Sequence, residues 1–319
     1  MSKKSLLSVL AIISLSGLVS CGGGAKYSKL QGSTMGTYYS ITYGEGESCS
    51  PQKKTVDNLL AHINSVMSTY EPDSELSLIN QNLQAGEYAI SQELHLVLGA
   101  SLTVWQETRG AFDVTIGPLV NLWGFGPTNA EETPTEFEQE AVAERIGMEN
   151  LELASNSIVK KQPDLFIDLS AIAKGYAVDR VAEKLSSLGC KDYLVDIGGE
   201  SFAKGQNQAG TPWKIGIEVP SPERRGIQRV LALSDLAIAT SGDYRNFRET
   251  AVGRVSHVMD PRNKLPVTSN IVSATVLHSS AMMADAYATS MMVLGYDDGM
   301  KLAEAQSFPV YLLVEESGG

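Results

Sequence analysis

Residues 165–199 read LFIDLSAIAKGYAVDRVAEKLSSLGCKDYLVDIGG, a stretch in which extended and helical signals follow one another closely. Apolar residues predict a strand at 165–168. Helical spacing then predicts a helix at 171–188, which Gly189 ends, and the run YLVDI predicts a second strand at 193–197. The middle of the chain is therefore expected to hold a helix between two strands.

The rest of the chain intermingles strands and helices without a regular pattern. Helical spacing predicts helices at 56–70, 91–108, 281–294 and 300–305, of which the second has Ser91 as its cap. Short apolar or alternating runs predict strands at 34–43, 213–219, 230–233, 236–239, 271–277 and 309–314. Because no βαβ repeat is present, an α+β fold is expected rather than a doubly wound sheet.

Composition limits the class of protein. The chain has 319 residues, of which 43% are hydrophobic, so there is enough apolar material for one large domain or two fused lobes. It carries 25 Lys and Arg against 37 Asp and Glu, a formal net charge of −12, which argues against a nucleic-acid partner. Residues 127–140 are acidic and aperiodic, which indicates a surface loop followed by a short helix.

The N-terminus, MSKKSLLSVLAIISLSGLVSC, resembles the signal peptide of a bacterial lipoprotein. Two lysines precede a short apolar stretch, and Leu18, Ser20 and Cys21 fit a lipobox in which Cys21 is lipidated. This reading divides the chain into a signal peptide at 1–20, a tether at 21–30 and a domain at 31–319. The alternative is an ordinary signal peptide with an incidental cysteine. After Cys21 only Cys49 and Cys190 remain, and an exported protein permits but does not establish their disulfide.

Two segments carry oxygen and backbone N–H groups suited to a phosphate and its cation. Asp285 and Thr289 are four residues apart and share a helix face, so they can supply two hard oxygen ligands to Mg²⁺. The alternative is an exposed pair on a helix surface. Residues 168–176 run from a strand into a helix, whose first N–H groups favour an anion, although an ordinary cap by Asp168 or Ser170 is an equal reading.

Two further signals are weaker. Gly198 and Gly199 follow a strand and allow close approach of a ligand, but neither a Rossmann fingerprint nor a P-loop is present. His257 precedes a turn-forming Asp-Pro pair and is a candidate proton acceptor, whereas the other three histidines have simple structural explanations. A lone histidine in a hairpin is more often structural.

Taken together, these segments resemble the ApbE family of flavin transferases, bacterial periplasmic lipoproteins also called FAD:protein FMN transferases. The resemblance covers nearly the whole mature chain. It rests on ordered blocks at 32–37, 67–70, 110–115, 117–120, 122–126, 168–176, 196–199, 240–246, 256–261 and 284–289. The family implies a two-lobed mixed architecture of sheet and helix with a central cleft.

The resemblance also implies site residues. Magnesium would be held by Asp285, Thr289 and the backbone carbonyl of Ala173, and His257 would be the catalytic base. FAD would lie against Met35, Tyr70, Ala111, Phe112, Asp113, Ser170, Tyr176 and Met259. Lys174 lies next to the implied carbonyl ligand, and its charge is expected to weaken Mg²⁺ binding unless it points to a phosphate.

The implied reaction transfers the FMN half of FAD to a threonine hydroxyl of an acceptor protein and releases AMP. The implied acceptors are flavin-carrying subunits of the Na⁺-translocating NADH:quinone reductase and of the Rnf complex, at the periplasmic side of the inner membrane. Two alternatives stay open from the residues alone. One is an FAD pyrophosphatase that gives FMN and AMP with water as nucleophile, and the other is a lipid-tethered flavin-binding protein without catalytic activity.

Overall fold

The computed structural model describes residues 26–46, 49–126, 133–220, 226–243, 247–250 and 253–315. The predicted signal peptide, the lipidation site Cys21 and residues 22–25 of the predicted tether lie outside these residues. So do residues 127–132 of the acidic loop and residues 244–246 of the block 240–246 on which the resemblance rests.

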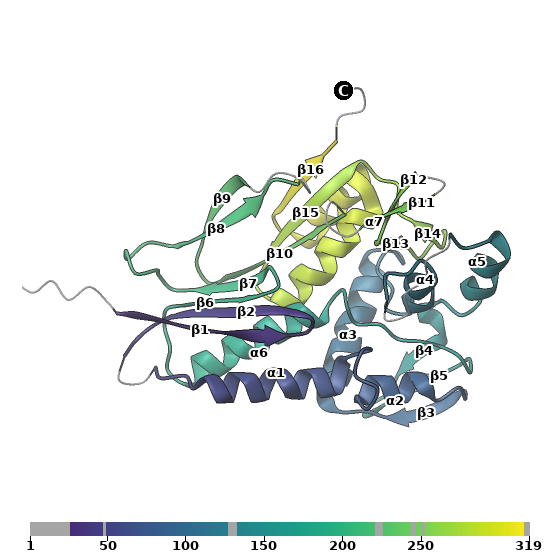
Figure 1. The fold of residues 1–319 in the computed structure, drawn as a ribbon, viewed down its shortest axis with the longest axis horizontal. Helices are drawn as coiled ribbons and strands as arrows, with labels where there is room; N and C mark the ends of the chain where they lie inside the picture. Colours follow the sequence, from purple (N-terminus) through teal and green to yellow (C-terminus); the bar gives the residue numbers. More distant parts are fainter. Residues whose placement is uncertain are drawn as a thin grey trace, which may run out of the picture.

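The largest layer is a sheet that has seven strands among the described residues, all paired antiparallel (Figure 1). Its order is β1 (Tyr27–Thr34), β2 (Thr37–Gly44), β6 (Tyr193–Ile197), β7 (Glu200–Lys204), β10 (Leu236–Gly242), β15 (Ile271–His278) and β16 (Val310–Val314). Antiparallel pairing throughout this sheet confirms the predicted α+β class.

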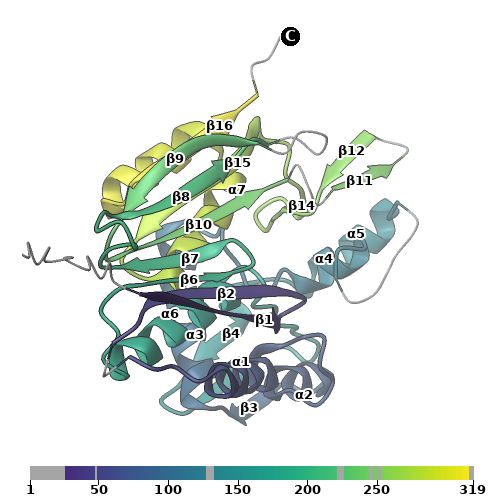
Figure 2. The same cartoon turned by 60° about the vertical axis from the view of Figure 1, so that its left-hand side comes forward.

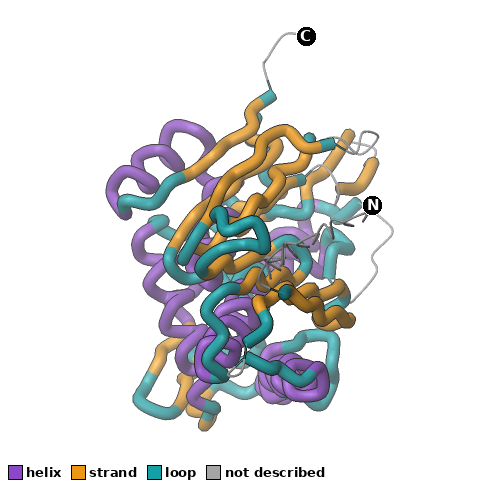
Figure 3. Tube along the Cα trace, turned by 90° about the vertical axis from the view of Figure 1, so that its left-hand side faces the viewer, coloured by secondary structure: helices purple, strands orange, loops and turns teal. Residues whose placement is uncertain are grey.

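The long helices cover one face of this sheet and form the main core with it. They are α1 (Lys53–Met67), α3 (Gln92–Glu107), α6 (Ala173–Ser187) and α7 (Ala281–Gln306). Helix α7 contacts β10 and β15, α6 contacts β6 and β7, and the two helices contact each other. Figure 3 shows helices along the left-hand side of the strand layer. Burial alternates along β2 as predicted, because every second side chain, Tyr39, Ile41 and Tyr43, is buried in this core.

Smaller elements surround this body (Figure 2). A second sheet is formed by β3 (Gly86–Ala89), β5 (Ser157–Lys160) and β4 (Leu151–Leu153), near α2 (Glu75–Gln81) and the short turn η1 (Met148–Asn150). Two-stranded ribbons follow at β8 (Trp213–Glu218) with β9 (Ile227–Leu233), β11 (Phe247–Thr250) with β12 (Gly253–Ser256), and β13 (Met259–Asp260) with β14 (Leu265–Pro266). The remaining helices are α4 (Gly117–Leu122) and α5 (Glu136–Ala143). The sequence predicts a short helix after the acidic loop 127–140, and α5 begins earlier, within that loop.

Some expected elements differ from the structure. No strand forms at 165–168, because the side chain of Asn80 takes both backbone bonds of Ile167 and the N–H of Asp168 donates to Val114. The helices predicted at 281–294 and 300–305 form one element, α7, interrupted at Gly295, whose φ of 74° is not helical. The predicted tether is also too long, since β1 begins at Tyr27 and pairs with β2.

The disulfide left open by the sequence is present in the structure. Cys49 and Cys190 are bonded, and the bond joins the segment before α1 to the segment between α6 and β6 across 141 positions. Both cysteines are buried. Among the described residues, no helix combines the length and the apolar character that crossing a membrane requires.

Candidate active site

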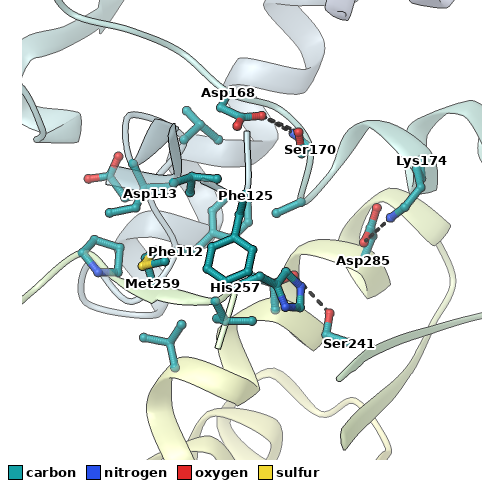
Figure 4. A pocket seen from close by; sticks show the side chains of 18 of the residues that line it. Phe112, Asp113, Phe125, Asp168, Ser170, Lys174, Ser241, His257, Met259 and Asp285 are labelled. Atoms are coloured by element: carbon teal, nitrogen blue, oxygen red, sulfur yellow. Dashed lines mark hydrogen bonds and ion pairs between the residues drawn. The ribbon is translucent and has the colours of Figure 1, made fainter. Parts of the chain in front are cut away.

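A cavity of about 450 Å³ lies where the helices, the main sheet and the small ribbons meet (Figure 4). This volume is typical of small-molecule sites. Most of the residues that the sequence indicated line it together, although they come from distant segments: Tyr70, Ala111, Phe112, Asp113, Ser170, His257, Met259, Asp285 and Thr289.

The remaining predicted residues do not line this cavity. Met35 lies in the turn between β1 and β2 with a φ of 50° and packs against the main core. Tyr176 is buried in the main core on α6. Ala173 is the first residue of α6, two positions before a residue that contacts Asp285. The assignments of Met35 and Tyr176 to FAD and of the Ala173 carbonyl to a metal stay predictions.

The cavity has an apolar end and a charged end. In Figure 4, Phe112 and Met259 lie on one side, and Lys174 and Asp285 lie on the other. His257 lies between them and points toward Ser241, and its ring meets that of Phe125 edge-on at 6.1 Å between centroids. This polarity suits a ligand with an aromatic ring system at one end and charged groups further along.

The charged end forms where α6 begins against α7. Asp285 is 2% exposed, and its Oδ2 accepts a hydrogen bond of 3.0 Å from the backbone N–H of Gly175. Position 175 must be glycine for this approach, because a Cβ there would lie 2.2 Å from the backbone oxygen of Ala281. Asp285 therefore faces the start of α6, not bulk water.

A second carboxylate holds the two helices together. Asp179 of α6 accepts hydrogen bonds from the backbone N–H groups of Ala281 and Met282 and from the hydroxyl of Ser280, the residue that caps α7. Burial raises the pKa of Asp179, and these three hydrogen bonds lower it by less. The reciprocal contacts fix the position of Asp285 relative to α6.

Hydroxyl groups continue the polar surface from Asp285. Thr289 lies one turn further along α7, and its Oγ1 is 3.1 Å from the Oγ of Ser241 at the end of β10. Both side chains line the cavity with Asp285. The predicted pairing of Asp285 and Thr289 on one helix face is therefore directed into a pocket.

Lys174 and Glu200 form an ion pair beside Asp285. Lys174 Nζ is 2.9 Å from Glu200 Oε1 and 3.8 Å from Asp285 Oδ1. Burial lowers the pKa of Lys174, but the two carboxylates together outweigh burial, so this pKa lies above its ordinary value. Burial, with a contribution from Asp285, raises the pKa of Glu200 to about 7, although Lys174 opposes the shift.

Two carboxylates that line the cavity, those of Asp113 and Asp168, accept hydrogen bonds from nearby groups of the protein. Both oxygens of Asp113 accept hydrogen bonds, one from the backbone N–H and hydroxyl of Thr115 and the other from the N–H of Met148. Burial raises the pKa of Asp113 against these hydrogen bonds. Asp168 accepts from the N–H and hydroxyl of Ser170, so it stabilises a turn and not the helix start expected there.

The helix predicted from residue 171 starts two residues later in the structure. α6 begins at Ala173, and its N-cap residue Ile172 makes no side-chain cap. The N–H of Gly175 is instead satisfied by Asp285 from α7. The alternative interpretation, in which Asp168 or Ser170 caps this helix, is therefore wrong, because a carboxylate from another helix takes that position.

Comparison with known proteins agrees with this architecture. A model of the ApbE family matches residues 35–312. The chain belongs to the ApbE family. It is 43% identical to the FAD:protein FMN transferase of Vibrio cholerae over 98% of this chain and 94% of that protein, and 39% identical to the one of Haemophilus influenzae over 99% and 95%.

Solved structures of the ApbE family share the fold. The flavin transferase ApbE from Vibrio cholerae superposes with a TM-score of 0.86 at 43% identity, covering 92% of this chain and 95% of that one. The apo flavinyl transferase ApbE of Pseudomonas stutzeri gives 0.83 at 32% identity, covering 92% of each chain. The mixed architecture with a large antiparallel sheet is thus the ApbE fold.

The donors at the charged end of this ApbE-family cavity fit Mg²⁺. The described residues contain no group of three or more His, Cys, Asp or Glu side chains suited to a metal. Asp285 and Thr289 nevertheless direct a carboxylate and a hydroxyl into one cavity. Magnesium commonly takes one or two carboxylates and completes its shell with water and substrate phosphate, so a sparse oxygen set is suitable.

Sequence reasoning missed Glu200, and it gave no role to Phe125 and Ser241, although these lie in the blocks 122–126 and 240–246; all three line the cavity in this ApbE-family member. A signal was available for Glu200. Gly198 and Gly199 have φ values of 61° and 106°, and they form a two-residue turn across which Ile197 pairs with Glu200. A glycine pair directly after a strand could thus have placed Glu200 at the start of the next strand.

Proposed function

We propose that this chain transfers the FMN half of FAD to a threonine hydroxyl of an acceptor protein, with Mg²⁺ as cofactor and AMP as leaving group. The observation that carries the proposal is the convergence of Asp285, Thr289 and His257 on one cavity whose other end is apolar. Membership of a family whose relatives bear the name FAD:protein FMN transferase supports it.

The apolar end suits the flavin ring. Phe112, Phe125 and Met259 supply aromatic and thioether surface there, and such groups pack well on a planar heteroaromatic ring. Ser170 and the start of α6 lie toward the charged end. The diphosphate of FAD would then lie near Asp285, and the position of the ring would orient the bond to be broken.

Asp285, Thr289 and the carbonyl of Ala173 would hold the Mg²⁺. When bound, this ion supplies charge neutralisation to the phosphate oxygens at which negative charge develops. Asp285 contributes the only carboxylate of this set, and its fixed contact with Gly175 keeps that carboxylate in place. Thr289 is similarly positioned by its contact with Ser241.

His257 would accept the proton of the acceptor threonine. As this proton moves to the imidazole, the threonine oxygen forms a bond to the phosphorus of the FMN half. The bond from this phosphorus to the bridging oxygen breaks, and AMP leaves with that oxygen and the electron pair of the bond. His257 lies between the apolar and charged ends of the cavity, which suits attack at the diphosphate.

The test is mass spectrometry of a threonine-bearing acceptor incubated with the protein, FAD and Mg²⁺. The expected product is an acceptor that gains the mass of FMN minus water, together with AMP, and a Thr→Val acceptor should gain nothing. Free FMN and AMP at a rate independent of acceptor would favour the pyrophosphatase. Intact FAD after long incubation would favour a flavin-binding protein.

The proposal extends to location and partners. The lipobox at Cys21 supports a lipid anchor, and the disulfide between Cys49 and Cys190 supports an oxidising compartment such as the periplasm. An enzyme tethered to the periplasmic side of the inner membrane would reach membrane-bound acceptors. Flavin-carrying subunits of the Na⁺-translocating NADH:quinone reductase or the Rnf complex are the acceptors we propose.

A further inference from the structure

Glu200 is a buried carboxylate at the charged end of the cavity that no step above uses. It is the first residue of β7 and is 4% exposed. Its Oε1 accepts a hydrogen bond from Lys174 Nζ, whereas its Oε2 is buried with no hydrogen-bond donor among the described residues. A buried carboxylate with one unsatisfied oxygen lowers the stability of the fold, so its presence at the cavity suggests a functional role.

The position of Lys174 gives Glu200 that role. The ammonium donates a hydrogen bond to Glu200 at 2.9 Å, whereas its ion pair with Asp285 Oδ1 is longer, at 3.8 Å, and beyond hydrogen-bonding distance. Gly175 N–H already occupies Oδ2 of Asp285, so Oδ1 is the oxygen left for a cation. Without Glu200, Asp285 would be the nearest partner for the ammonium, which would then compete directly with a metal ion.

We propose that Glu200 is a positioning residue that holds Lys174 away from Asp285 and so keeps Asp285 available to a divalent cation. This inference rests on the proposed function, because it assumes that Asp285 binds the metal. Lys174 and Glu200 carry opposite charges and cancel, which leaves the single negative charge of Asp285 to attract the ion. An unpaired ammonium a few ångströms away would repel a dication by several times the thermal energy.

Direct Mn²⁺ binding at pH 8, followed by the loss of the electron paramagnetic resonance signal of free Mn²⁺, tests this inference without turnover. We expect Glu200→Gln to weaken Mn²⁺ binding roughly tenfold or more, since the ammonium then has only Asp285 as a charged partner. The charge-matched double variant, Lys174→Met with Glu200→Gln, removes both charges. It should bind within roughly threefold of the unmodified protein.

Restoration of Mn²⁺ affinity in the double variant would distinguish a positioning role of Glu200 from a purely structural one. If Glu200 only supported the fold, Lys174→Met would not restore the affinity that Glu200→Gln removed. Equal Mn²⁺ affinity in Glu200→Gln and the unmodified protein, or a double variant as weak as Glu200→Gln, would overturn the inference. Absence of saturable binding by the unmodified protein would contradict cation binding at Asp285 and would overturn this inference, whereas the acceptor assay tests the metal-dependent transfer separately.

Discussion

The carboxylate of Asp285 accepts a hydrogen bond from the backbone N–H of Gly175, a residue 110 positions earlier in the chain. This contact joins the first turn of α6 to the second turn of α7 and places one carboxylate oxygen at the cavity. It also satisfies an N–H group that the helix cannot satisfy itself. The candidate metal site is therefore built on the packing of two helix ends.

Gly175→Ala is expected to destabilise the protein by ~1–3 kcal/mol, because the new Cβ overlaps the backbone of Ala281 and α6 must move away from α7. Denaturation in urea measures the change. Gly99→Ala in α3 is the matched control, since its Cβ would meet only Leu153 Cδ2 at 3.6 Å, an ordinary contact. Equal stability of Gly175→Ala and the unmodified protein would contradict the close approach of the two helices.

Asp179→Asn is expected to cost ~1–3 kcal/mol, because an amide has one acceptor oxygen where the carboxylate serves three donors across two. Burial raises the pKa of Asp179 above its ordinary 3.8, so the folded state favours the protonated form. As the pH rises from the ordinary pKa of Asp179 through its raised pKa in the folded state, the unmodified protein loses the stability that this group contributes. The Asp179→Asn variant has no titrating group at this position and shows no such loss.

The stability gap between the unmodified protein and Asp179→Asn should accordingly narrow as the pH rises above 3.8, the ordinary pKa of an aspartate. Urea unfolding of both proteins across this range measures the gap. A gap that widens with pH would show instead that the hydrogen bonds from α7 outweigh burial and hold the pKa below 3.8.

Reduction of the bond between Cys49 and Cys190 is expected to lower the free energy of unfolding by ~2–5 kcal/mol, since the bond closes a long loop of the unfolded chain. Thermal unfolding with and without dithiothreitol measures this. The double variant Cys49→Ser, Cys190→Ser serves as control and should melt at one temperature in both conditions. A reductant effect of equal size in the double variant would rule out the disulfide as its cause.

His257→Gln is expected to reduce FMN transfer by roughly 10²–10⁴-fold while FAD binding changes little, because in the mechanism we propose His257 takes the threonine proton and glutamine cannot. Flavin fluorescence gives the affinity and the acceptor assay gives the rate. Phe125→Ala is a useful contrast, since Phe125 packs against the His257 ring and lines the cavity, and its loss should weaken FAD binding. Undiminished transfer in His257→Gln would remove His257 from the mechanism.

Cys21→Ser should release the protein from the membrane if Cys21 carries the lipid. The unmodified protein is expected in the detergent phase of fractionated cells and the variant in the aqueous phase or as uncleaved precursor, because one cysteine is the sole lipidation site that the leader indicates. Immunoblotting of the fractions measures this. A processed Cys21→Ser variant that stays in the detergent phase would point to a different anchor.

Local patterns predicted much of the fold and of the site. The strand 193–197 and the cap at Ser91 agree with β6 and with the start of α3, since alternation and capping depend on near neighbours in the chain. The spacing of Asp285 and Thr289 likewise predicted a shared helix face. Blocks of sequence along the chain indicated the ApbE family, to which the chain belongs.

Contacts between distant residues could not be derived in this way. Nothing in residues 165–168 shows that the Asn80 side chain takes the backbone bonds that a strand partner would use. The pairing of Cys49 with Cys190 and of Lys174 with Glu200 depends equally on how helices pack on the sheet. Periodicity tells each segment which face to bury, whereas the identity of the neighbour on that face depends on packing of the whole chain, because buried polar groups must find partners wherever the fold brings them together.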